Sequence, residues 1–496
     1  MILFAIIAIV LFIVYVKWRH SYWTRLGIYQ MQPEFFIGNA RSVLTGKTSF
    51  AQTVYERYNS IKATGQQCGG IYLFLEPAVY FIDPKLIKTI LQKDFQYFMS
   101  HGLYHHPKDI LSMNLFNMEG DVWRNLRAKL TPTFTSGKMK MMFDTIIEKT
   151  NGLEAMVDKF ASNQQPFAIK EALGRFTTDI IGSCAFGIEC NSLEDPDNLF
   201  RAYGKKVFEP NLYRFWLFNL LPWWFLGNIG FKSNGRDVSE FFIKVVKETI
   251  KTRQENQIFR KDFMHLLLEL KNMEINEKNP LTITDDEIAA QCFIFFLAGF
   301  ETSSTNMTFA LLELAQNPEI QEKLRDEIND VIERHGGKIT YDAVMEMKYL
   351  DMVINETLRK FPPVTILPRI CTKDYEIPGT KSTIKKGTRV HIPVWGLHRD
   401  PDYYPDPDVF DPERFNEENK LKRPDFTFLP FGEGPRMCIG LRFGMLQSRV
   451  GLISLIRNFS FSLNKKTSLP IRMSSGSVII SVKGEVWLDA KKIRDY

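Results

Sequence analysis

The sequence has 496 residues but no feature that would divide a chain of this length into separate domains. It lacks Gly/Ser-rich and Pro-rich linkers, long runs of like charge, internal repeats and low-complexity segments. Length alone would suggest about three domains. We instead expect one large domain over residues 26–496, preceded by an N-terminal segment over residues 1–25. With 45% hydrophobic residues, such a domain can bury a large core and still enclose an apolar cavity.

Cysteine is scarce, with six residues in the whole chain and no Cys-x-x-Cys pair. This usage fits a reducing compartment rather than a disulfide framework. We expect five of the six to be buried free thiols: Cys68, Cys184, Cys190, Cys292 and Cys371. Only the sixth, Cys438, has a motif around it.

The chain also lacks concentrated charge and a Gly-rich dinucleotide fingerprint. Its net charge of +6 is spread along the sequence, which suits an anionic membrane surface or an acidic partner and is too weak to indicate nucleic acid binding. No Gly-x-Gly-x-x-Gly motif follows a predicted strand. Electrons for any redox reaction must therefore come from another protein.

The N-terminus has neither mark of a cleaved signal peptide, which are positive charge before the apolar run and a small-x-small site after it. Met1–Val16 is unbroken apolar sequence, and Lys17, Trp18 and Arg19 follow it. This run is short for a spanning helix, but Lys17 and Trp18 can lie at the interface and extend it. Because the positive charge follows the run, we expect a single N-terminal anchor with the rest of the chain on the cytosolic side.

A second apolar stretch, Phe215–Phe231, is interrupted too often to span a bilayer. It includes Trp223 and Trp224, and tryptophan favours the headgroup layer of a membrane. Two alternatives stay open for this stretch: ordinary core packing, or a loop that dips into the membrane surface.

Most of the remaining chain has helical periodicity. The clearest helix begins at Thr284, where Thr284-x-x-Glu287 forms a capping box, and it ends before Pro318. Such a helix would be about 50 Å long, enough to cross a whole domain. Further helices are expected over Asn317–Gly336 and Met347–Phe361.

Strand patterns are few. Ile71–Ile82 predicts a hairpin that turns around Glu76-Pro77, and Val390–Val394 and Val478–Val482 predict short strands. The predicted fold class is therefore mainly α with a small, segregated β-sheet part (α+β).

The most informative segment is Phe431-x-x-Gly434-x-Arg436-x-Cys438-x-Gly440, which precedes an amphipathic stretch predicted to be helical. A helix N-terminus favours the thiolate that binds iron, because its free N–H groups and dipole lower the pKa of a cysteine. Gly434 allows a tight turn with positive φ, and Gly440 leaves room for backbone to approach a flat macrocycle. Arg436 can pair with a carboxylate of that macrocycle as a bidentate fork. The segment thus predicts a haem-thiolate site.

Four further motifs occur along the chain. They are Trp123-x-x-x-Arg127, Ala298-Gly299-Phe300-Glu301-Thr302, Glu356-x-x-Arg359 and Pro412-Glu413-Arg414-Phe415. Together with the cysteine segment, they resemble the cytochrome P450 family of haem-thiolate monooxygenases over essentially the whole chain after the anchor. The sequence is similar to the microsomal, xenobiotic-metabolising type found in insects. The Pro-Pro-Gly-Pro hinge usual in that type is missing, and only Pro33 remains.

The resemblance implies iron protoporphyrin IX between the long central helix and the helix after the cysteine, with Cys438 as the axial metal ligand. It assigns these cofactor-binding residues: Trp123, Arg127, Ala298, Gly299, Arg369, Phe431, Arg436 and Gly440. Arg127, Arg369 and Arg436 would neutralise the haem propionates, which are costly to bury unpaired. Glu356, Arg359 and Arg414 would form a buried charge network that serves folding and haem retention.

The catalytic residues implied by the resemblance are Thr302 and Glu301, a hydroxyl and an acid that can relay protons to bound oxygen. Gly299 would open room for dioxygen, and Ala298 would lie over the ring. The alternative for this pair is structural: a helical threonine often donates to the carbonyl four residues earlier, and a helical glutamate often faces solvent.

Partners follow from the same resemblance. They are an NADPH–cytochrome reductase that supplies electrons from NADPH, possible help from cytochrome b5, O2, a small lipophilic substrate and the endoplasmic reticulum membrane at its cytosolic face. The reductase would meet the basic residues Arg124, Lys129 and Arg442. Substrate contacts are expected at Phe116, Phe296, Val364, Leu367 and Val478, although each of these is apolar enough for simple packing.

Three alternatives to a monooxygenase stay open at this stage. A thiolate-haem isomerase or dehydratase would keep the haem but would not need the pair Glu301-Thr302. A non-catalytic haem sensor would bind carbon monoxide without oxidising a substrate. Cys438 as a nucleophile would need a partner histidine, and no motif links it to His391 or His398.

Overall fold

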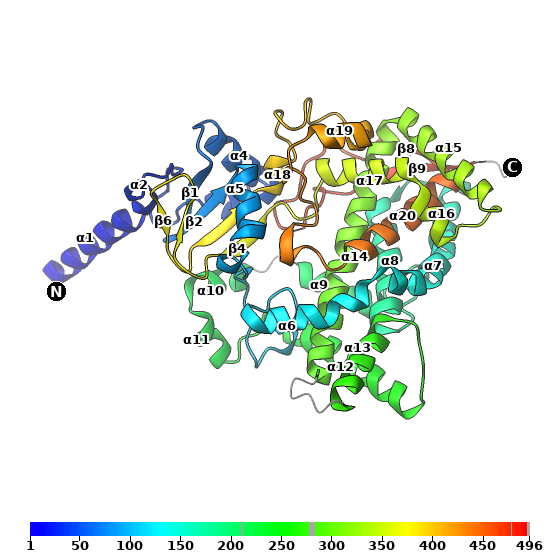
Figure 1. Ribbon diagram of the computed structural model, residues 1–496, viewed down its shortest axis with the longest axis horizontal. Coiled ribbons are helices and arrows are strands. Elements are labelled where there is room, and N and C mark those ends of the chain that lie inside the picture. Colours follow the sequence, from blue (N-terminus) through cyan, green and yellow to red (C-terminus); the bar gives the residue numbers. More distant parts are fainter. Residues whose placement is uncertain (210–211, 277–282, 478, 494–496) are drawn as a thin grey trace.

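The computed structural model describes residues 1–209, 212–276, 283–477 and 479–493 of the chain (Figure 1). Helices form most of the molecule, and the strands lie in small separate sheets. The predicted fold class, mainly α with a segregated β part, is confirmed. The α-helices are α1 (Ile2–Arg19), α2 (Tyr22–Arg25), α3 (Arg41–Thr45), α4 (Phe50–Lys62), α5 (Pro84–Lys88), α6 (Gly120–Leu130), α7 (Ser136–Ser162), α8 (Ile169–Ile181), α9 (Leu199–Phe208), α10 (Leu212–Leu220), α11 (Trp223–Asn228), α12 (Arg236–Glu255), α13 (Phe263–Asn276), α14 (Asp285–Gln316), α15 (Pro318–Arg334), α16 (Tyr341–Glu346), α17 (Lys348–Lys360), α18 (Val394–Leu397), α19 (Glu417–Lys422) and α20 (Leu441–Asn458).

The largest sheet has the strand order β1-β2-β7-β4 and lies at the N-terminal end of the molecule (Figure 1). Strands β2 and β7 pair in parallel, and the other pairs are antiparallel. A second sheet has the order β3-β9-β8, and β5 pairs with β6. The strands are β1 (Cys68–Leu73), β2 (Glu76–Phe81), β3 (Phe167–Ala168), β4 (Leu367–Ile370), β5 (Tyr375–Glu376), β6 (Thr383–Ile384), β7 (Arg389–Ile392), β8 (Phe459–Leu463) and β9 (Trp487–Lys492).

Two strand predictions need correction. The hairpin turns at 74–75, where Phe74 has a φ of +58°, and Pro77 lies inside β2 opposite Tyr72. The predicted strand Val478–Val482 is not a strand: Val478 lies outside the described residues, and Ile479 and Val482 make only isolated bridges. Short alternation alone cannot distinguish such bridges from a strand.

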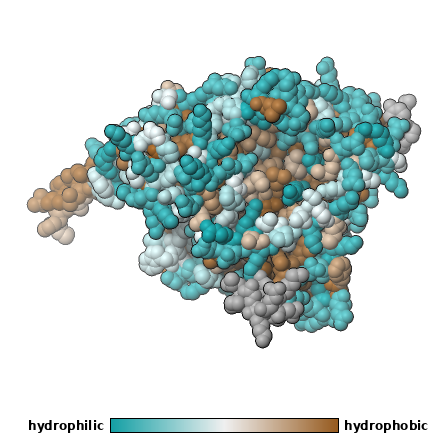
Figure 2. Space-filling view, viewed as in Figure 1, coloured by the Kyte–Doolittle hydropathy of each residue, from teal (hydrophilic) through white to brown (hydrophobic). Residues whose placement is uncertain are grey.

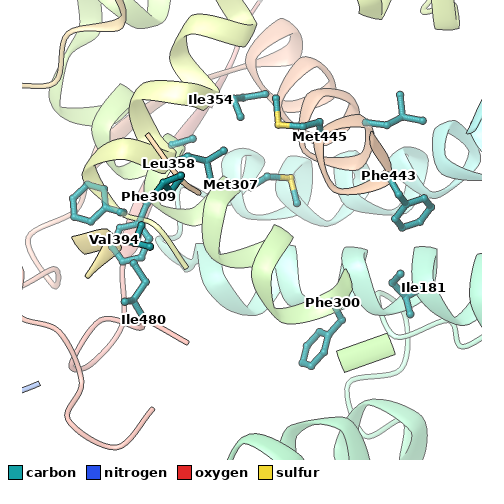
Figure 3. Packing of buried hydrophobic residues seen from close by; sticks show 14 of the residues in the cluster. Ile181, Phe300, Met307, Phe309, Ile354, Leu358, Val394, Phe443, Met445 and Ile480 are labelled. Atoms are coloured by element: carbon teal, nitrogen blue, oxygen red, sulfur yellow. The ribbon is translucent and has the colours of Figure 1, made fainter. Parts of the chain in front are cut away.

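Helix α14 crosses the centre of the molecule, as its sequence predicts. Its capping box is formed: the Thr284 N–H donates to Glu287 Oε2 at 2.8 Å, and the Glu287 N–H donates to Thr284 Oγ1 at 3.2 Å. Helices α8, α12, α17 and α20 pack around it. Figure 3 shows Met307 and Phe309 of α14 among apolar side chains of α17 and α20. This burial fixes the position of α14 in the core.

Helix α1 projects from the body as an apolar rod (Figures 1 and 2). Of the described helices it alone is long and apolar enough to cross a membrane, and every side chain up to Arg19 except Val16 is at least partly exposed. The segment after it is packed against the sheet. The Trp23 indole is fully buried, donates to the Ile71 carbonyl at 3.1 Å, and lies so close to Gly70 that a Cβ there would be 2.1 Å from its ring. Packing rather than a proline hinge therefore fixes the junction.

The second apolar stretch forms α10 and α11, which lie at the same end of the molecule as α1 (Figure 1). The Trp216 ring lies 5.1 Å from the Phe74 ring, at the turn of the hairpin. On α11 and just beyond it, Trp224, Phe225 and Ile229 are exposed. These exposed side chains argue against simple core packing for this part of the stretch.

Candidate active site

Cys438 is held by a short turn that leads into α20. The Cys438 N–H donates to the Phe431 carbonyl at 2.9 Å, which closes the turn around the 3-10 segment η7 (Gly434–Arg436). Gly434 has the positive φ predicted for it, +75°, and a Cβ there would lie 2.0 Å from the Leu91 carbonyl oxygen. A side chain at residue 434 is therefore excluded both by conformation and by space.

The thiol lies at the N-terminus of α20. Gly440 is the residue before this helix, and nothing lies within 4 Å of a Cβ built on it. Cys438 is exposed. Desolvation by the surrounding protein raises the pKa of its thiol, and the Gly440 N–H and the Arg127 guanidinium oppose this shift without cancelling it. The other five cysteines are buried free thiols, as predicted, and burial raises the pKa of Cys68 to about 11.

The middle turn of α14, residues 298–302, borders an accessible space, although most of the helix is buried. Ala298 is exposed and Thr302 is half-buried, whereas residues 303–315 are buried throughout. The Thr302 hydroxyl donates to the Ala298 carbonyl, which is the bond expected of a helical threonine. The Glu301 carboxylate does not face solvent, because its Oε1 lies 2.9 Å from Lys170 Nζ of α8.

Two buried arginines converge near the cysteine turn. Arg436 stacks on the Trp123 indole with 4.0 Å from its Cζ to the ring centroid, and it donates to the Met99 carbonyl at 2.8 Å. Arg369 on β4 donates to the adjacent Pro368 carbonyl, and its Nε has no partner. Burial lowers the pKa of Arg369 to about 10; burial and then repulsion from Arg369 lower that of Arg436 to about 9. Within the part of the chain that the structure describes, neither guanidinium forms an ion pair with a carboxylate.

A buried histidine and a third arginine complete this basic cluster. His101 Nδ1 lies 2.9 Å from the Phe116 carbonyl, and burial together with Arg369 and Arg436 lowers the His101 pKa well below its ordinary value. Arg127 on α6 donates to the Met437 carbonyl at 2.8 Å, beside the cysteine. The three arginines of the cluster therefore concentrate positive charge where a bound anion would be stabilised, and His101 among them is neutral.

The three residues of the predicted buried charge network, called the lock below, come together. Glu356 and Arg359 are completely buried on α17 and form a bidentate pair with both N···O distances at 2.7 Å. Arg414, from the 3-10 segment η6 (Pro412–Phe415), approaches Glu356 Oε1 with its Nε at 3.6 Å. The Glu356 carboxylate also accepts the Asp411 N–H at 3.0 Å. Two arginines and a backbone N–H therefore compensate the buried charge of the Glu356 carboxylate.

His398 connects the lock to the cysteine turn, a link that no motif indicates. Arg359 donates to the His398 carbonyl at 2.9 Å, and the Leu429 N–H donates to His398 Nε2 at 2.8 Å. Burial and the Arg359 charge lower the His398 pKa well below its ordinary value, so this ring is neutral. Its Nε2 serves as the hydrogen-bond acceptor for the Leu429 N–H. Burial lowers the pKa of His391 to about 3. Neither ring is bonded to Cys438, which speaks against cysteine-nucleophile chemistry.

Residues 32–487 match the family described as Cytochrome P450. Relatives from insects match almost the whole chain. Cytochrome P450 6A1 of Musca domestica is 41% identical over 97% of this chain and 95% of its own length. The probable cytochrome P450 6a21 of Drosophila melanogaster is 40% identical over 96% of each chain, and cytochrome P450 6a2 of the same species is 39% identical over 99% of each.

The chain belongs to the cytochrome P450 family. It is an oxidoreductase of the haem-thiolate monooxygenase type, with a cysteine-bound haem iron, O2, a lipophilic substrate and electrons from a reductase. The isomerase and the sensor are not favoured.

The residues around Cys438 in this cytochrome P450 fit a haem. An accessible thiol at a helix N-terminus suits the iron, and open space at Gly440 and the exposed Ala298 suit the flat faces of the ring. Buried cationic groups without carboxylate partners, Arg369 and Arg436, suit two propionates. The donor set therefore matches the cofactor that the family uses.

Gly299 has a role in helix packing that its motif does not indicate. A Cβ at this position would lie 2.4 Å from Ile181 Cδ1, so the glycine lets α14 pack closely against α8. Figure 3 shows Ile181 beside the turn that carries Phe300. The glycine is thus required by helix packing, whatever room it leaves for dioxygen.

The predicted substrate residues are spread over several environments. Phe116 is exposed, and Val364 and Leu367 are half-buried, with Leu367 side-chain carbons 3.8 Å from a Cβ built on Gly432. Phe296 is fully buried, and its ring lies 4.8 Å from that of Phe200 and 5.2 Å from that of Phe300. Val478 lies outside the described residues. The assignment of these residues to substrate contact stays a prediction.

Proposed function

We propose that this cytochrome P450 inserts one oxygen atom from O2 into small lipophilic molecules, xenobiotic or lipid-like. The observation that carries the proposal is the accessible Cys438 thiol at the N-terminus of α20, with the exposed turn of α14 in the same core. A haem iron held by the Cys438 thiolate would supply the oxygen activation. The chain's own residues hold the cofactor and move protons. Cys438 would be the axial ligand.

For cofactor binding, we infer that Arg369 and Arg436 pair with the propionates, with Arg127 and the Trp123 indole beside them. Support comes from the absence of carboxylate partners for the two buried guanidiniums in the described chain. A dianionic edge would offset the burial that lowers both pKa values and the repulsion by Arg369 that further lowers the pKa of Arg436. Glu356, Arg359 and Arg414 would stabilise the cysteine turn from behind through His398.

For proton delivery, we infer that Thr302 and Glu301 relay protons at the exposed turn of α14. The Thr302 hydroxyl holds a proton that it donates to the Ala298 carbonyl and that it could pass on, and Glu301 is the adjacent residue of the same turn. A positioned hydroxyl and acid speed proton transfer when they are within hydrogen-bond reach of the reacting group.

Replacement of Thr302 by alanine tests this relay. We expect NADPH consumption to continue, product per NADPH to fall by about tenfold, and hydrogen peroxide to rise, since the lost hydroxyl no longer delivers protons. The three quantities are measured together in the reconstituted system with reductase.

Thr308→Ala is the matched control, because the Thr308 hydroxyl makes the same kind of bond, to the Ser304 carbonyl at 2.7 Å, but is buried in the core. It should leave the ratio of product to NADPH unchanged. Equal coupling in Thr302→Ala and wild type would remove Thr302 from the relay.

Electron supply would come from a membrane-bound NADPH–cytochrome reductase, with cytochrome b5 as a second donor. A cavity of about 350 Å³ borders the cysteine turn and is lined by Phe431, Met437 and Arg442. Arg442 is exposed there, and Arg124 is an exposed arginine on α6. We infer that this basic surface receives the acidic face of the reductase.

For location, we propose anchorage in the endoplasmic reticulum membrane by α1, with the catalytic body on the cytosolic face. The exposed Trp224, Phe225 and Ile229 would rest in the headgroup layer beside the anchor.

This contact can be tested with the full-length protein. A solvatochromic dye on Ile229→Cys should shift its emission to shorter wavelength when the protein enters phospholipid vesicles, since Ile229 is 62% exposed in the protein alone. The same dye on Leu421→Cys, at an 88% exposed residue on α19, should not shift. Equal behaviour of the two labelled proteins would contradict the contact.

A further inference from the structure

The middle turn of α14 is held by side chains from three helices. Four successive carbonyls, at residues 298–301, each accept a side-chain hydrogen bond. The donors are Thr302 to Ala298, Gln447 to Gly299 at 2.8 Å, Thr177 to Phe300 at 3.0 Å, and Lys170 to Glu301 at 3.4 Å. Side-chain donors to helical carbonyls compete with the regular ladder and locally reshape a helix. The turn that carries the proposed relay is therefore fixed from outside as well as by its own helix.

Of these donors, only Lys170 also binds a relay side chain. Its Nζ lies 2.9 Å from Glu301 Oε1, 3.0 Å from Ser304 Oγ and 2.7 Å from Thr305 Oγ1. Only 17% of the Glu301 side chain and 26% of the Lys170 side chain are exposed. Together with the Glu301 carbonyl, these atoms give the three ammonium protons four acceptors, all of them on α14. This arrangement fixes where the carboxylate points.

The charges around Lys170 come from three other elements. Glu301 of α14 contacts it, and the charges of Arg201 on α9 and of Glu485, which precedes β9, also act on it. Burial lowers the Lys170 pKa, and the Glu301 charge opposes that shift. Arg201 adds to the lowering, and the exposed Glu485 opposes it.

We propose that Lys170 is a positioning residue for proton delivery, which holds the Glu301 carboxylate turned toward α8. Glu301 then reaches the active space only when it leaves Lys170, so the ion pair sets how often the acid is available to deliver a proton. This inference rests on the proposed relay role of Glu301. It adds a residue on a different helix, 131 positions away in the sequence.

The test compares Lys170→Met, Lys170→Arg, Glu301→Gln and the Lys170→Met/Glu301→Gln double variant as reductase-reconstituted holoenzymes. We expect Lys170→Met to lower product per NADPH by about fivefold, and to move the pH profile of that ratio to higher pH, because a buried carboxylate without its cation binds protons more readily. Lys170→Arg keeps the positive charge and should keep both the ratio and the profile within about twofold.

A readout independent of turnover follows the ion pair itself. Lys170→Met and Glu301→Gln should each melt at a lower temperature than wild type. The double variant should lose less than the sum of these two losses, since either change alone already breaks the ion pair. Lys205→Met is the matched control: Lys205 pairs with Glu171 of the same α8 at 3.0 Å but does not touch Glu301. It should leave coupling and pH profile unchanged.

The outcomes separate this proposal from the relay assignment. If Glu301→Gln lowers coupling and Lys170→Met does not, the relay stands and the positioning role is overturned. If Lys170→Met lowers coupling as much in the Glu301→Gln background as in wild type, Lys170 does not act through Glu301, and the proposal is again overturned. If Glu301→Gln itself leaves coupling unchanged, the relay role of Glu301 fails.

Discussion

Cys438→Ala should yield a protein without the carbon monoxide difference band of thiolate-ligated haem and without monooxygenase activity. Cys438 is the one cysteine of the six that is exposed, and it lies directly before α20 with the Gly440 N–H near its sulfur. An alanine has no ligand to offer iron, so turnover should fall by several orders of magnitude, the full contribution of the cofactor chemistry. The measurements are the reduced carbon monoxide difference spectrum and product formation.

Two further variants guard this experiment against a simple folding failure. Cys438→His offers an imidazole instead of a thiolate, and should retain haem while losing the thiolate-type band. Cys68→Ala, at a buried cysteine in β1, should keep both band and activity. A thiolate-type band from Cys438→Ala would show that another residue binds the iron.

Glu356→Gln should strongly destabilise the holoprotein. The substitution removes the charge that neutralises Arg359, whose side chain is 0% exposed, and it weakens the approach of Arg414. Removal of one partner of a buried ion pair costs about 3–5 kcal/mol, because the other charge stays buried and uncompensated. We expect a large fall in melting temperature and loss of bound haem, measured by thermal unfolding and by haem content per chain.

Glu418→Gln is the matched control for this prediction. Glu418 pairs with Lys422 on the exposed side of α19, with 77% and 65% of the two side chains exposed. Exposed pairs contribute little to stability, so this variant should have the same melting temperature as wild type. A Glu356→Gln protein that retains haem and unfolds with the control would show that the network is not needed for folding.

Features that depend on neighbouring residues could be predicted from the sequence. The capping box at Thr284 and Glu287 defines the start of α14 within four residues, and the cysteine segment specifies its own turn through Gly434. The buried Glu356–Arg359 pair lies within one helical turn. In each case the interacting groups are close in the sequence, so local geometry decides their contact.

Features that depend on distant residues could not. Lys170 has no motif, and its contact with Glu301 follows only from the packing of α8 against α14. The environment of Gly299 depends on Ile181, and the place of His398 depends on the approach of Leu429. The aromatic neighbours of Phe296, Phe200 of α9 and Phe300 of α14, likewise follow from how the helices pack. Side-chain chemistry alone does not show which neighbour the fold brings.

The junction between α1 and the body has a consequence for motion. The Trp23 indole is buried on Gly70 and donates to the Ile71 carbonyl, so the catalytic body is held at the base of α1. In the membrane anchorage that we propose, the body would therefore not swivel on a loose tether. Anchor and body should then reorient as one unit, with a rotational correlation time set by the lipid around α1. The angle between the active-site opening and the bilayer surface would be a fixed property of the folded chain, so molecules dissolved in the lipid would meet that opening from a constant direction.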